Sequence, residues 1–196
     1  MSASGPEIVE WRQKVAEPPT LQPSQVEVVV ALDESTAREC YHIRHEVFAN
    51  EMGMTPSTSS RMLRDRFDGE NRTVNLLALC DGEPAAATRL ILPRSNTFTD
   101  FPLEQLFRLE GLPRAEVAEL PSSAVLARFR STRRLIATLW TTTAAFARDE
   151  YGIEVLVAGV NIGTDDLGEG LMVFTALTDQ GATHPSARAI PLTPHT

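Results

Sequence analysis

An arginine-rich stretch, residues 128–134 (RFRSTRR), is the segment whose residue types most clearly suggest chemistry. It holds four guanidinium groups, at Arg128, Arg130, Arg133 and Arg134, in a 196-residue chain of net charge −8. Guanidinium groups bind phosphate bidentately, and the N-terminus of a helix also favours anions. Helical spacing predicts a helix that begins near Thr132, which would place Arg133 and Arg134 in its first turn. The stretch therefore predicts a site for an anionic ligand.

Charged side chains also recur in three motifs and at the end of one strand. These residues are Arg44, Asp65, Asp68, Arg89 and Glu119. The motif RHEVF places Phe48 one helical turn after Arg44, on the same face of the helix. By spacing alone, the two arginines and two aspartates can form either a structural ion-pair network or a functional site.

Hydrophobic periodicity predicts the elements that would position these residues. Strands are expected at residues 26–32, 73–80, 83–92, 115–120, 153–160 and about 187–190, with Asp81-Gly82 as a tight hairpin turn. Helices are expected after the first strand and at residues 101–111, 132–151 and 166–180. In the long helix, Leu139 and Trp140 are expected to belong to the core.

The order of these elements predicts one α/β domain with a mixed central sheet flanked by helices. We assign residues 26–196 to this domain. Residues 1–25 contain four prolines and show no clear period, which favours a flexible N-terminal arm. Neither a dinucleotide-binding fingerprint nor a P-loop is present in the sequence.

Composition argues against several classes of protein. A net charge of −8 disfavours a general binder of nucleic acid or of membrane surfaces. The N-terminus lacks a signal-peptide pattern, and no apolar stretch approaches the roughly 20 residues that span a bilayer. Cys40 and Cys80 form no CxxC pair, which suits a reducing cytoplasm. His42 and His45 lack a clear third ligand, so no metal is expected.

Four motifs together resemble those of the acyl-homoserine lactone synthases, the quorum-sensing autoinducer enzymes of the GNAT acyltransferase superfamily. That family has an Arg-x-x-Val-Phe helix, an Asp-x-Phe/Tyr-Asp loop, an Arg-Leu-Leu-Pro strand end and a Glu-Leu-Ser-Arg strand. The corresponding segments here are RHEVF (44–48), DRFD (65–68), RLILP (89–93) and ELPS (119–122). The resemblance covers roughly residues 26–162, and it is the combination of motifs that is specific.

Three positions depart from the pattern of that family. Met54 stands about where the family has a tryptophan, Leu63 replaces an acidic residue, and Pro121-Ser122 replaces Ser-Arg. In the family these positions shape the pocket for S-adenosylmethionine. The resemblance therefore implies an acyltransferase with a different amine substrate, and relatives that acylate amino acids or other amines are the better analogy.

The resemblance implies a GNAT-like fold whose fourth and fifth strands are splayed around a pantetheine arm. The reaction would be attack of a small-molecule amine on the thioester of acyl-CoA, or of acyl-phosphopantetheine on an acyl carrier protein. Glu119 would be the base, and Asp65 and Asp68 would hold an ammonium group, with Arg44 and Arg89 keeping both carboxylates ionised.

The resemblance also implies where the two substrates bind. Phe48 and Met54 would lie in the substrate pocket. Backbone N–H groups around Ser122, Ser123 and Val125 would stabilise the oxyanion. The four arginines of residues 128–134 would bind the donor phosphate, with the acidic surface of a carrier protein against the outer ones.

Two alternatives remain open at this point. An ordinary acetyl-CoA N-acetyltransferase usually has a glycine-containing loop where this chain has RFRSTRRL, which contains no glycine. A non-catalytic ligand sensor or partner-binding module on the same fold would be favoured if Glu119 faced solvent and side chains filled the cleft.

Overall fold

The computed structural model describes residues 25–132, 134–159 and 188–191. The predicted N-terminal arm, apart from Gln25, and the helix predicted at residues 166–180 lie outside the described residues. None of the described helices is long and apolar enough to cross a membrane.

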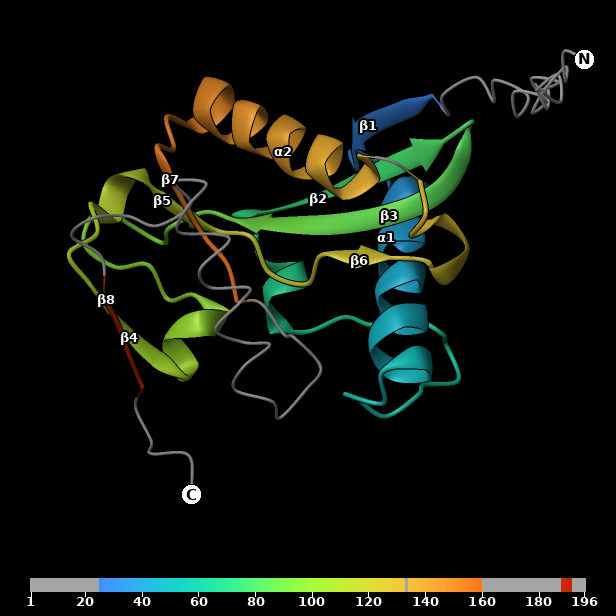
Figure 1. Cartoon of the computed structure of the whole chain (residues 1–196). Coiled ribbons are helices and arrows are strands. Elements are labelled where there is room, and N and C mark those ends of the chain that lie inside the picture. The colour runs from blue at the N-terminus through green and yellow to red at the C-terminus, as the bar shows by residue number, and fades with distance from the viewer. Residues whose placement is uncertain (1–24, 133, 160–187, 192–196) are drawn as a thin grey trace, which may run out of the picture.

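A six-stranded mixed sheet carries one long helix on each face (Figure 1). Its strands are β1 (Val26–Val30), β2 (Thr73–Cys80), β3 (Glu83–Ile91), β5 (Val117–Glu119), β6 (Ala124–Val125) and β7 (Val155–Val157). The order is β1-β2-β3-β5-β7, and β6 pairs with β3. The β5–β7 pair is parallel and the other pairs are antiparallel. This confirms the predicted α/β class and mixed sheet.

The β2–β3 hairpin is the longest paired segment and forms as the sequence predicts. Asp81 (φ 52°) and Gly82 (φ 83°) both adopt positive φ angles, as a two-residue hairpin turn requires. Side chains alternate between the two faces of the strands. Leu76, Ala78 and Leu90 therefore pack under one helix, while Leu77 and Ala87 pack under the other.

Helix α1 (Glu34–His45) covers one face of the sheet and continues without a break into the π-helical segment Glu46–Glu51. Asp33 caps its N-terminus by accepting a hydrogen bond from the Thr36 N–H at 2.8 Å. In the π-helical segment, Met52 N–H donates to Val47 O at 3.0 Å, and Gly53 (φ 63°) follows. Such wide turns are frequent at functional sites.

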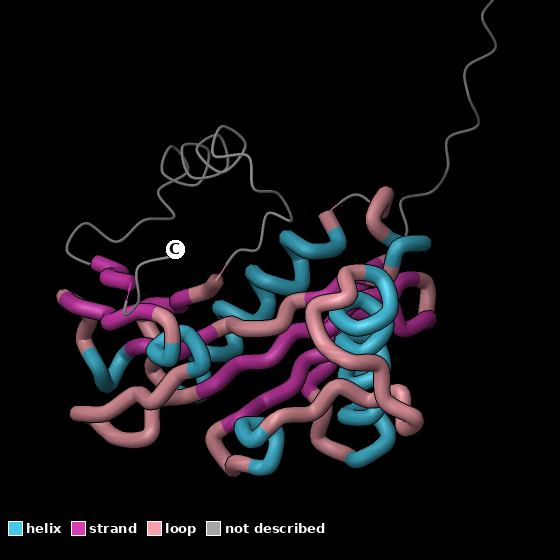
Figure 2. The backbone as a smooth tube through the Cα atoms, turned by 90° about the horizontal axis from the view of Figure 1, so that it is seen from below, coloured by secondary structure: helices cyan, strands magenta, loops and turns pink. Residues whose placement is uncertain are grey.

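Helix α2 (Leu135–Tyr151) crosses the opposite face and closes the main core, as Figures 1 and 2 show from two directions. Leu135, Leu139 and Ala147 are buried against β2 and β3. Gly152 (φ 65°) ends the helix, as predicted. The start differs from the prediction, because the helix begins at Leu135 and not near Thr132.

A second, two-stranded sheet lies beside the main one and consists of β4 (Phe107–Glu110) and β8 (Arg188–Pro191). The sequence predicted a helix over residues 101–111. Only the single 3₁₀ turn Pro102–Gln105 is helical, because residues 107–110 pair with β8 instead. Further 3₁₀ turns are Arg66–Gly69, Arg114–Glu116 and Ala127–Phe129.

The pairing between β5 and β7 stops just beyond Glu119. The register ends at Glu119↔Val157, and among the described residues the last bond between the two segments runs from Leu120 N–H to Val157 O at 2.8 Å. The chain then turns at Ser122 (φ 58°), and β6 pairs with β3 alone. This confirms the predicted splay between the two strands.

Candidate active site

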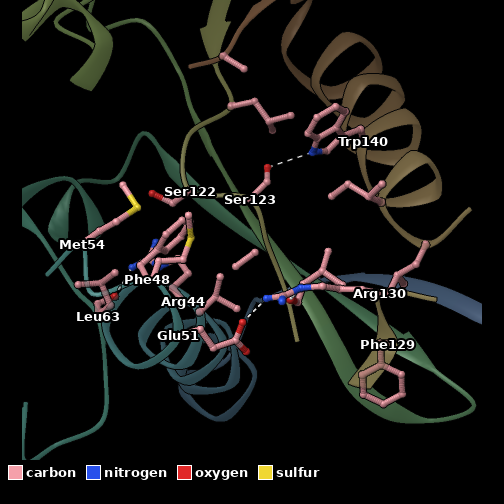
Figure 3. Close-up of a pocket in the computed structure, with 18 of the residues that line it drawn as sticks. Arg44, Phe48, Glu51, Met54, Leu63, Ser122, Ser123, Phe129, Arg130 and Trp140 are labelled. Atoms are coloured by element: carbon pink, nitrogen blue, oxygen red, sulfur yellow. Dashed lines mark hydrogen bonds and ion pairs between the residues drawn. The ribbon is translucent and has the colours of Figure 1, made fainter. Parts of the chain in front are cut away.

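A cavity of about 1160 Å³ opens where the strands separate (Figure 3). Its wall on the α1 side includes Phe48, Met54 and Leu63, and its wall on the α2 side includes Leu135, Ile136 and Trp140. Between the helices, the sheet contributes Leu120, Ser122, Ser123, Ala124, Val125, Ala158 and Gly159. Phe48 and Met54 thus line the cavity, where the substrate pocket was predicted.

Four of the predicted site residues form one ion-pair network. Arg44 donates to both carboxylate oxygens of Asp68, at 3.1 and 2.7 Å, and to the carbonyl oxygen of Leu63. Arg89 donates to both oxygens of Asp65, at 2.7 and 2.9 Å. Arg89 Nη1 also lies 3.1 Å from Asp68 Oδ2, which joins the two pairs.

The burial of these side chains separates the two aspartates. Asp68 is fully buried (0% exposed), whereas the Asp65 side chain is 48% exposed. Asp68 also accepts the backbone N–H of Asp65 at 2.9 Å, which caps the 3₁₀ turn Arg66–Gly69. Asp65 and Arg44 line the cavity. Asp65 is therefore the aspartate that a substrate can touch, and Asp68 holds the two arginines in place.

The charge on Asp65 is stabilised by its partner. Burial raises the pKa of this carboxyl, but the hydrogen bonds and charge of Arg89, the Phe67 N–H and the charge of Arg44 together lower it more, so the net pKa lies below the usual value. Asp65 is therefore ionised at neutral pH and can hold an ammonium group beside the cavity.

Glu119 is buried behind the cavity wall and is 2% exposed. Its Oε2 accepts the Leu103 N–H at 3.0 Å. Burial raises the pKa of Glu119 to about 7, although Leu103 and Arg89 act in the opposite direction. Its neighbour Leu120 lines the cavity, and a Cβ at Gly159 would meet Leu103 Cδ1 at 3.4 Å. Glu119 therefore lies next to residues of the cavity wall without lining the cavity itself.

One edge of β6 faces the cavity. Leu126 N–H donates to Ala85 O at 3.0 Å, towards β3. Successive residues of a strand direct their N–H groups to opposite edges, so the Val125 N–H faces away from β3. Val125 lines the cavity, as do Ser122 and Ser123. This is the backbone segment in which the oxyanion site was predicted.

Trp140 was predicted to be core and instead lines the cavity, with 38% of its surface exposed. Its Nε1–H donates to Ser123 Oγ at 3.0 Å (Figure 3). Ser123 Oγ also lies 2.7 Å from Thr88 Oγ1. Leu139 is fully buried as expected. The sequence did contain a signal for this position of Trp140. Ile136 and Trp140 lie one helical turn apart, on the same helix face, directly after the arginine-rich stretch.

The arginine-rich stretch divides between cavity and surface. Arg130 and Arg134 line the cavity, and Arg134 precedes the helix in a left-handed conformation (φ 68°) rather than lying in its first turn. The Arg128 guanidinium stacks on Phe129 at 4.7 Å and lies 3.7 Å from Glu83. Arg133 lies outside the described residues. Because Leu135 and Ile136 also line the cavity, the N-terminus of α2 opens onto it.

The two histidines bind backbone and side chains of the following loop. His42 Nδ1 lies 2.7 Å from Arg61 O, and His45 Nε2 accepts the Thr58 N–H at 3.1 Å. Among the residues that the structure describes, no group of His, Cys, Asp and Glu could hold a metal ion.

Comparison with known proteins decides the family. The model of the family described as N-acyl amino acid synthase FeeM matches residues 39–191, which is most of the chain. The chain belongs to the FeeM family. Members of the FeeM family are N-acyltransferases, so this protein is an enzyme that transfers an acyl group to an amine. No curated protein sequence matches the chain at a significant level.

Solved structures show that this FeeM-family protein has the GNAT fold. The CoA-dependent acyl-homoserine lactone synthase BjaI, solved with SAM and isopentyl-CoA, is 19% identical with a TM-score of 0.57, over 86% of this chain and 81% of that one. The aminoglycoside N-acetyltransferase AAC(6')-Iy, solved with CoA, is 12% identical with a TM-score of 0.56, over 88% and 97%. Ribosomal-protein-alanine N-acetyltransferase from Brucella melitensis biovar Abortus 2308 is 13% identical with a TM-score of 0.50, over 78% and 91%.

The buried network predicts a large loss of stability when its centre is neutralised. Asp68→Asn should lower the free energy of unfolding by about 3 kcal/mol, because it leaves Arg44 and Arg89 without their shared buried counter-charge. Urea denaturation measures the change. The control is Glu34→Gln, which breaks the exposed Glu34–Arg38 pair (65% and 57% exposed) and should cost less than about 1 kcal/mol. Equal losses in the two variants would show that the network does not stabilise the fold.

Proposed function

We propose that this FeeM-family enzyme joins an acyl chain to the amino group of an amino acid, taking the chain from a phosphopantetheine thioester. The observation that carries the proposal is the cavity at the gap in the sheet. It has guanidinium groups and the N-terminus of α2 on one side and the ionised Asp65 on the other. An anionic donor and a cationic acceptor can therefore approach the gap from different sides.

The donor side supports either coenzyme A or an acyl carrier protein. Arg130 and Arg134 line the cavity next to the first turn of α2, which suits the phosphate of a phosphopantetheine arm. From its position in the sequence, we expect Arg133 to be a third phosphate ligand. The Arg128 side chain is 62% exposed, which would suit contact with the acidic surface of a carrier protein. Solved neighbours of the fold include complexes with CoA and isopentyl-CoA.

The acceptor side combines one carboxylate with apolar walls. Asp65 would bind the ammonium group of the amino acid, with Arg89 and Asp68 fixing its orientation. Phe48, Met54 and Leu63 offer apolar surface to the rest of the substrates. The three departures from the acyl-homoserine lactone synthase pattern fall at Met54, Leu63 and Pro121-Ser122, and of these Met54, Leu63 and Ser122 line the cavity. This supports an acceptor other than S-adenosylmethionine.

The proposed chemistry is a direct transfer without a covalent enzyme intermediate. The ammonium group at Asp65 first loses one proton to Glu119 through a water molecule. The free amine then attacks the thioester carbonyl carbon, so that a C–N bond forms and the C–S bond breaks. The Val125 N–H and the turn at Ser122 and Ser123 stabilise the oxyanion. The second proton that the nitrogen loses goes to the leaving thiolate.

The size of the cavity favours an acyl chain longer than acetyl. A volume of about 1160 Å³, with Leu120, Ile136 and Trp140 in its wall, is more than a two-carbon group needs. A non-catalytic module would be expected to have an exposed Glu119 and a filled cleft, whereas Glu119 is buried and the cavity is open. Cys40 and Cys80 are free thiols, which suits a cytoplasmic location as part of this proposal.

Product analysis tests the proposed function directly. The purified enzyme would be incubated with acyl-CoAs and acyl carrier proteins of several chain lengths and a mixture of the twenty amino acids. Mass spectrometry should detect N-acyl amino acids and free thiol in equal amounts. Transfer confined to acetyl groups, or to amines that are not amino acids, would contradict the proposal.

The role of Glu119 predicts a specific kinetic defect. Glu119→Gln should lower kcat by about 100-fold while the KM for the donor changes little, as expected for loss of a general base. Since the pKa of Glu119 is raised to about 7, wild-type kcat should rise with pH up to about 7 and then level off, and the variant should lack this rise. An unchanged kcat would leave Glu119 a purely structural role.

The arginines at the cavity predict salt-dependent binding of the donor. Arg134→Glu should raise the donor KM at least tenfold with a smaller effect on kcat, because it reverses a charge beside the phosphate. The wild-type donor KM should also rise between low and physiological salt. Arg148→Glu, at the far end of α2, is the matched charge reversal and should change neither the donor KM nor its dependence on salt. A donor KM indifferent to both salt and Arg134→Glu would show that the stretch is only a solvated face.

A further inference from the structure

An ion pair bridges the cavity between its two sides. The Arg130 guanidinium, on the loop before α2, pairs through Nη2 with the Glu51 carboxylate at the end of the π-helical segment. Both residues line the cavity, and Figure 3 shows their side chains meeting there. They are 79 positions apart in sequence. The bridge therefore connects two elements that approach the cavity separately.

The same guanidinium also occupies the free edge of β6. Arg130 Nε donates to Val125 O at 3.2 Å. Like its N–H, the carbonyl of Val125 faces away from β3, because the bonds to β3 come from the residues before and after it. An extended ligand that carries amide groups would bind this edge as an added strand. Arg130 thus takes the acceptor that such a ligand needs.

We propose that Glu51 holds Arg130 on the edge of β6 in the free enzyme, and that the phosphate of the donor draws Arg130 away and opens the edge. This inference rests on the proposed function, in which the donor is a phosphopantetheine thioester. On binding, Arg130 exchanges the Glu51 carboxylate and the Val125 carbonyl for phosphate oxygens. The amide groups of the donor then reach Val125. Arg130 thereby both obstructs the cleft and recruits the correct donor.

This exchange makes entry depend on the phosphate. A donor with a phosphate replaces one anionic partner of Arg130 by another, so the charge of the guanidinium stays compensated. A donor without a phosphate breaks the contacts to Glu51 and Val125 and provides no substitute. Glu51 and Arg130 are therefore specificity-determining residues that select phosphate-bearing acyl donors.

A static clamp is the competing explanation, and it predicts different kinetics. If Arg130 already stands where the phosphate binds, Glu51 only orients it. Glu51→Gln would then raise the KM of a phosphate-bearing donor and leave that of a phosphate-free donor unchanged. The exchange predicts that Glu51→Gln lowers the KM instead, because either donor must break the bridge between Glu51 and Arg130 in order to bind.

The test compares two donors that differ only in the phosphate, acyl-4'-phosphopantetheine and acyl-pantetheine. Glu51→Gln should lower the KM of both donors by a similar factor of about three to five, the size expected for one partly exposed ion pair. Arg130→Gln should move them in opposite directions. The KM of acyl-pantetheine should fall, because the obstruction is gone, and that of acyl-phosphopantetheine should rise, because a phosphate ligand is lost.

Two further measurements make the result decisive. When Glu51→Gln is added to Arg130→Gln, the KM of each donor should not change further, because the partner of Glu51 is already absent. Glu34→Gln changes the net charge by the same amount on the exposed face of α1 and should alter neither KM. Melting temperatures identify any variant whose fold is damaged. Should Glu51→Gln be damaged, Glu51→Asp takes its place, because its shorter side chain weakens the contact with Arg130.

The outcomes separate this inference from the proposed function. If no donor transfers its acyl group to any amino acid, the proposed function fails. If transfer proceeds but Arg130→Gln leaves the KM of acyl-pantetheine unchanged or raises it, the exchange is wrong and the static clamp holds. Opposite shifts of the two KM values support the exchange.

Discussion

The cavity exists because the pairing between β5 and β7 stops after three residues. A sheet that ran on would bring Val125 beside the continuation of β7 and leave no room for a ligand. Instead the chain turns at Ser122 (φ 58°), and β6 follows β3 alone. The sheet then has an unpaired inner edge, which is costly unless another group binds it. In the described structure that group is Arg130, which donates to the carbonyl of Val125 at 3.2 Å.

The buried charges beside this gap pair with one another, but their burial costs free energy of desolvation. Arg44 and Arg89 are almost fully buried and share Asp68, yet the Nε of each arginine finds no hydrogen-bond partner among the described residues. Apolar side chains of similar volume would stabilise such a core at least as well. The arrangement is understandable if the network serves Asp65, whose carboxylate it holds at the edge of the cavity in one orientation.

The sequence predicted the fold and the network well, and for a physical reason. Alternation and turn chemistry are local, so the hairpin with Asp81-Gly82 and the α/β order followed directly. The pairing of Arg44 with Asp68 and of Arg89 with Asp65 depended on distant contacts, and only the resemblance to a known family brought these motifs together. Helical periodicity placed Trp140 in the core, because a pattern of apolar residues cannot show that the sheet beneath a helix has a gap. Residues 107–110 have the composition of a helix, but their pairing with β8 is a tertiary contact that propensity does not contain.

The wide turn at the end of the first helix has a consequence for evolution of the site. A π-helical segment holds one residue more per turn than an α-helix of the same path, so it behaves like a single inserted residue. The extra residue is taken up within that one turn, so the residues before and after it keep the positions that a regular helix would give them. Arg44, which precedes the wide turn, therefore keeps its place in the network whether or not the extra residue is present. The end of the helix beside the cavity can in this way gain or lose a residue during evolution without disturbing the buried charges beneath.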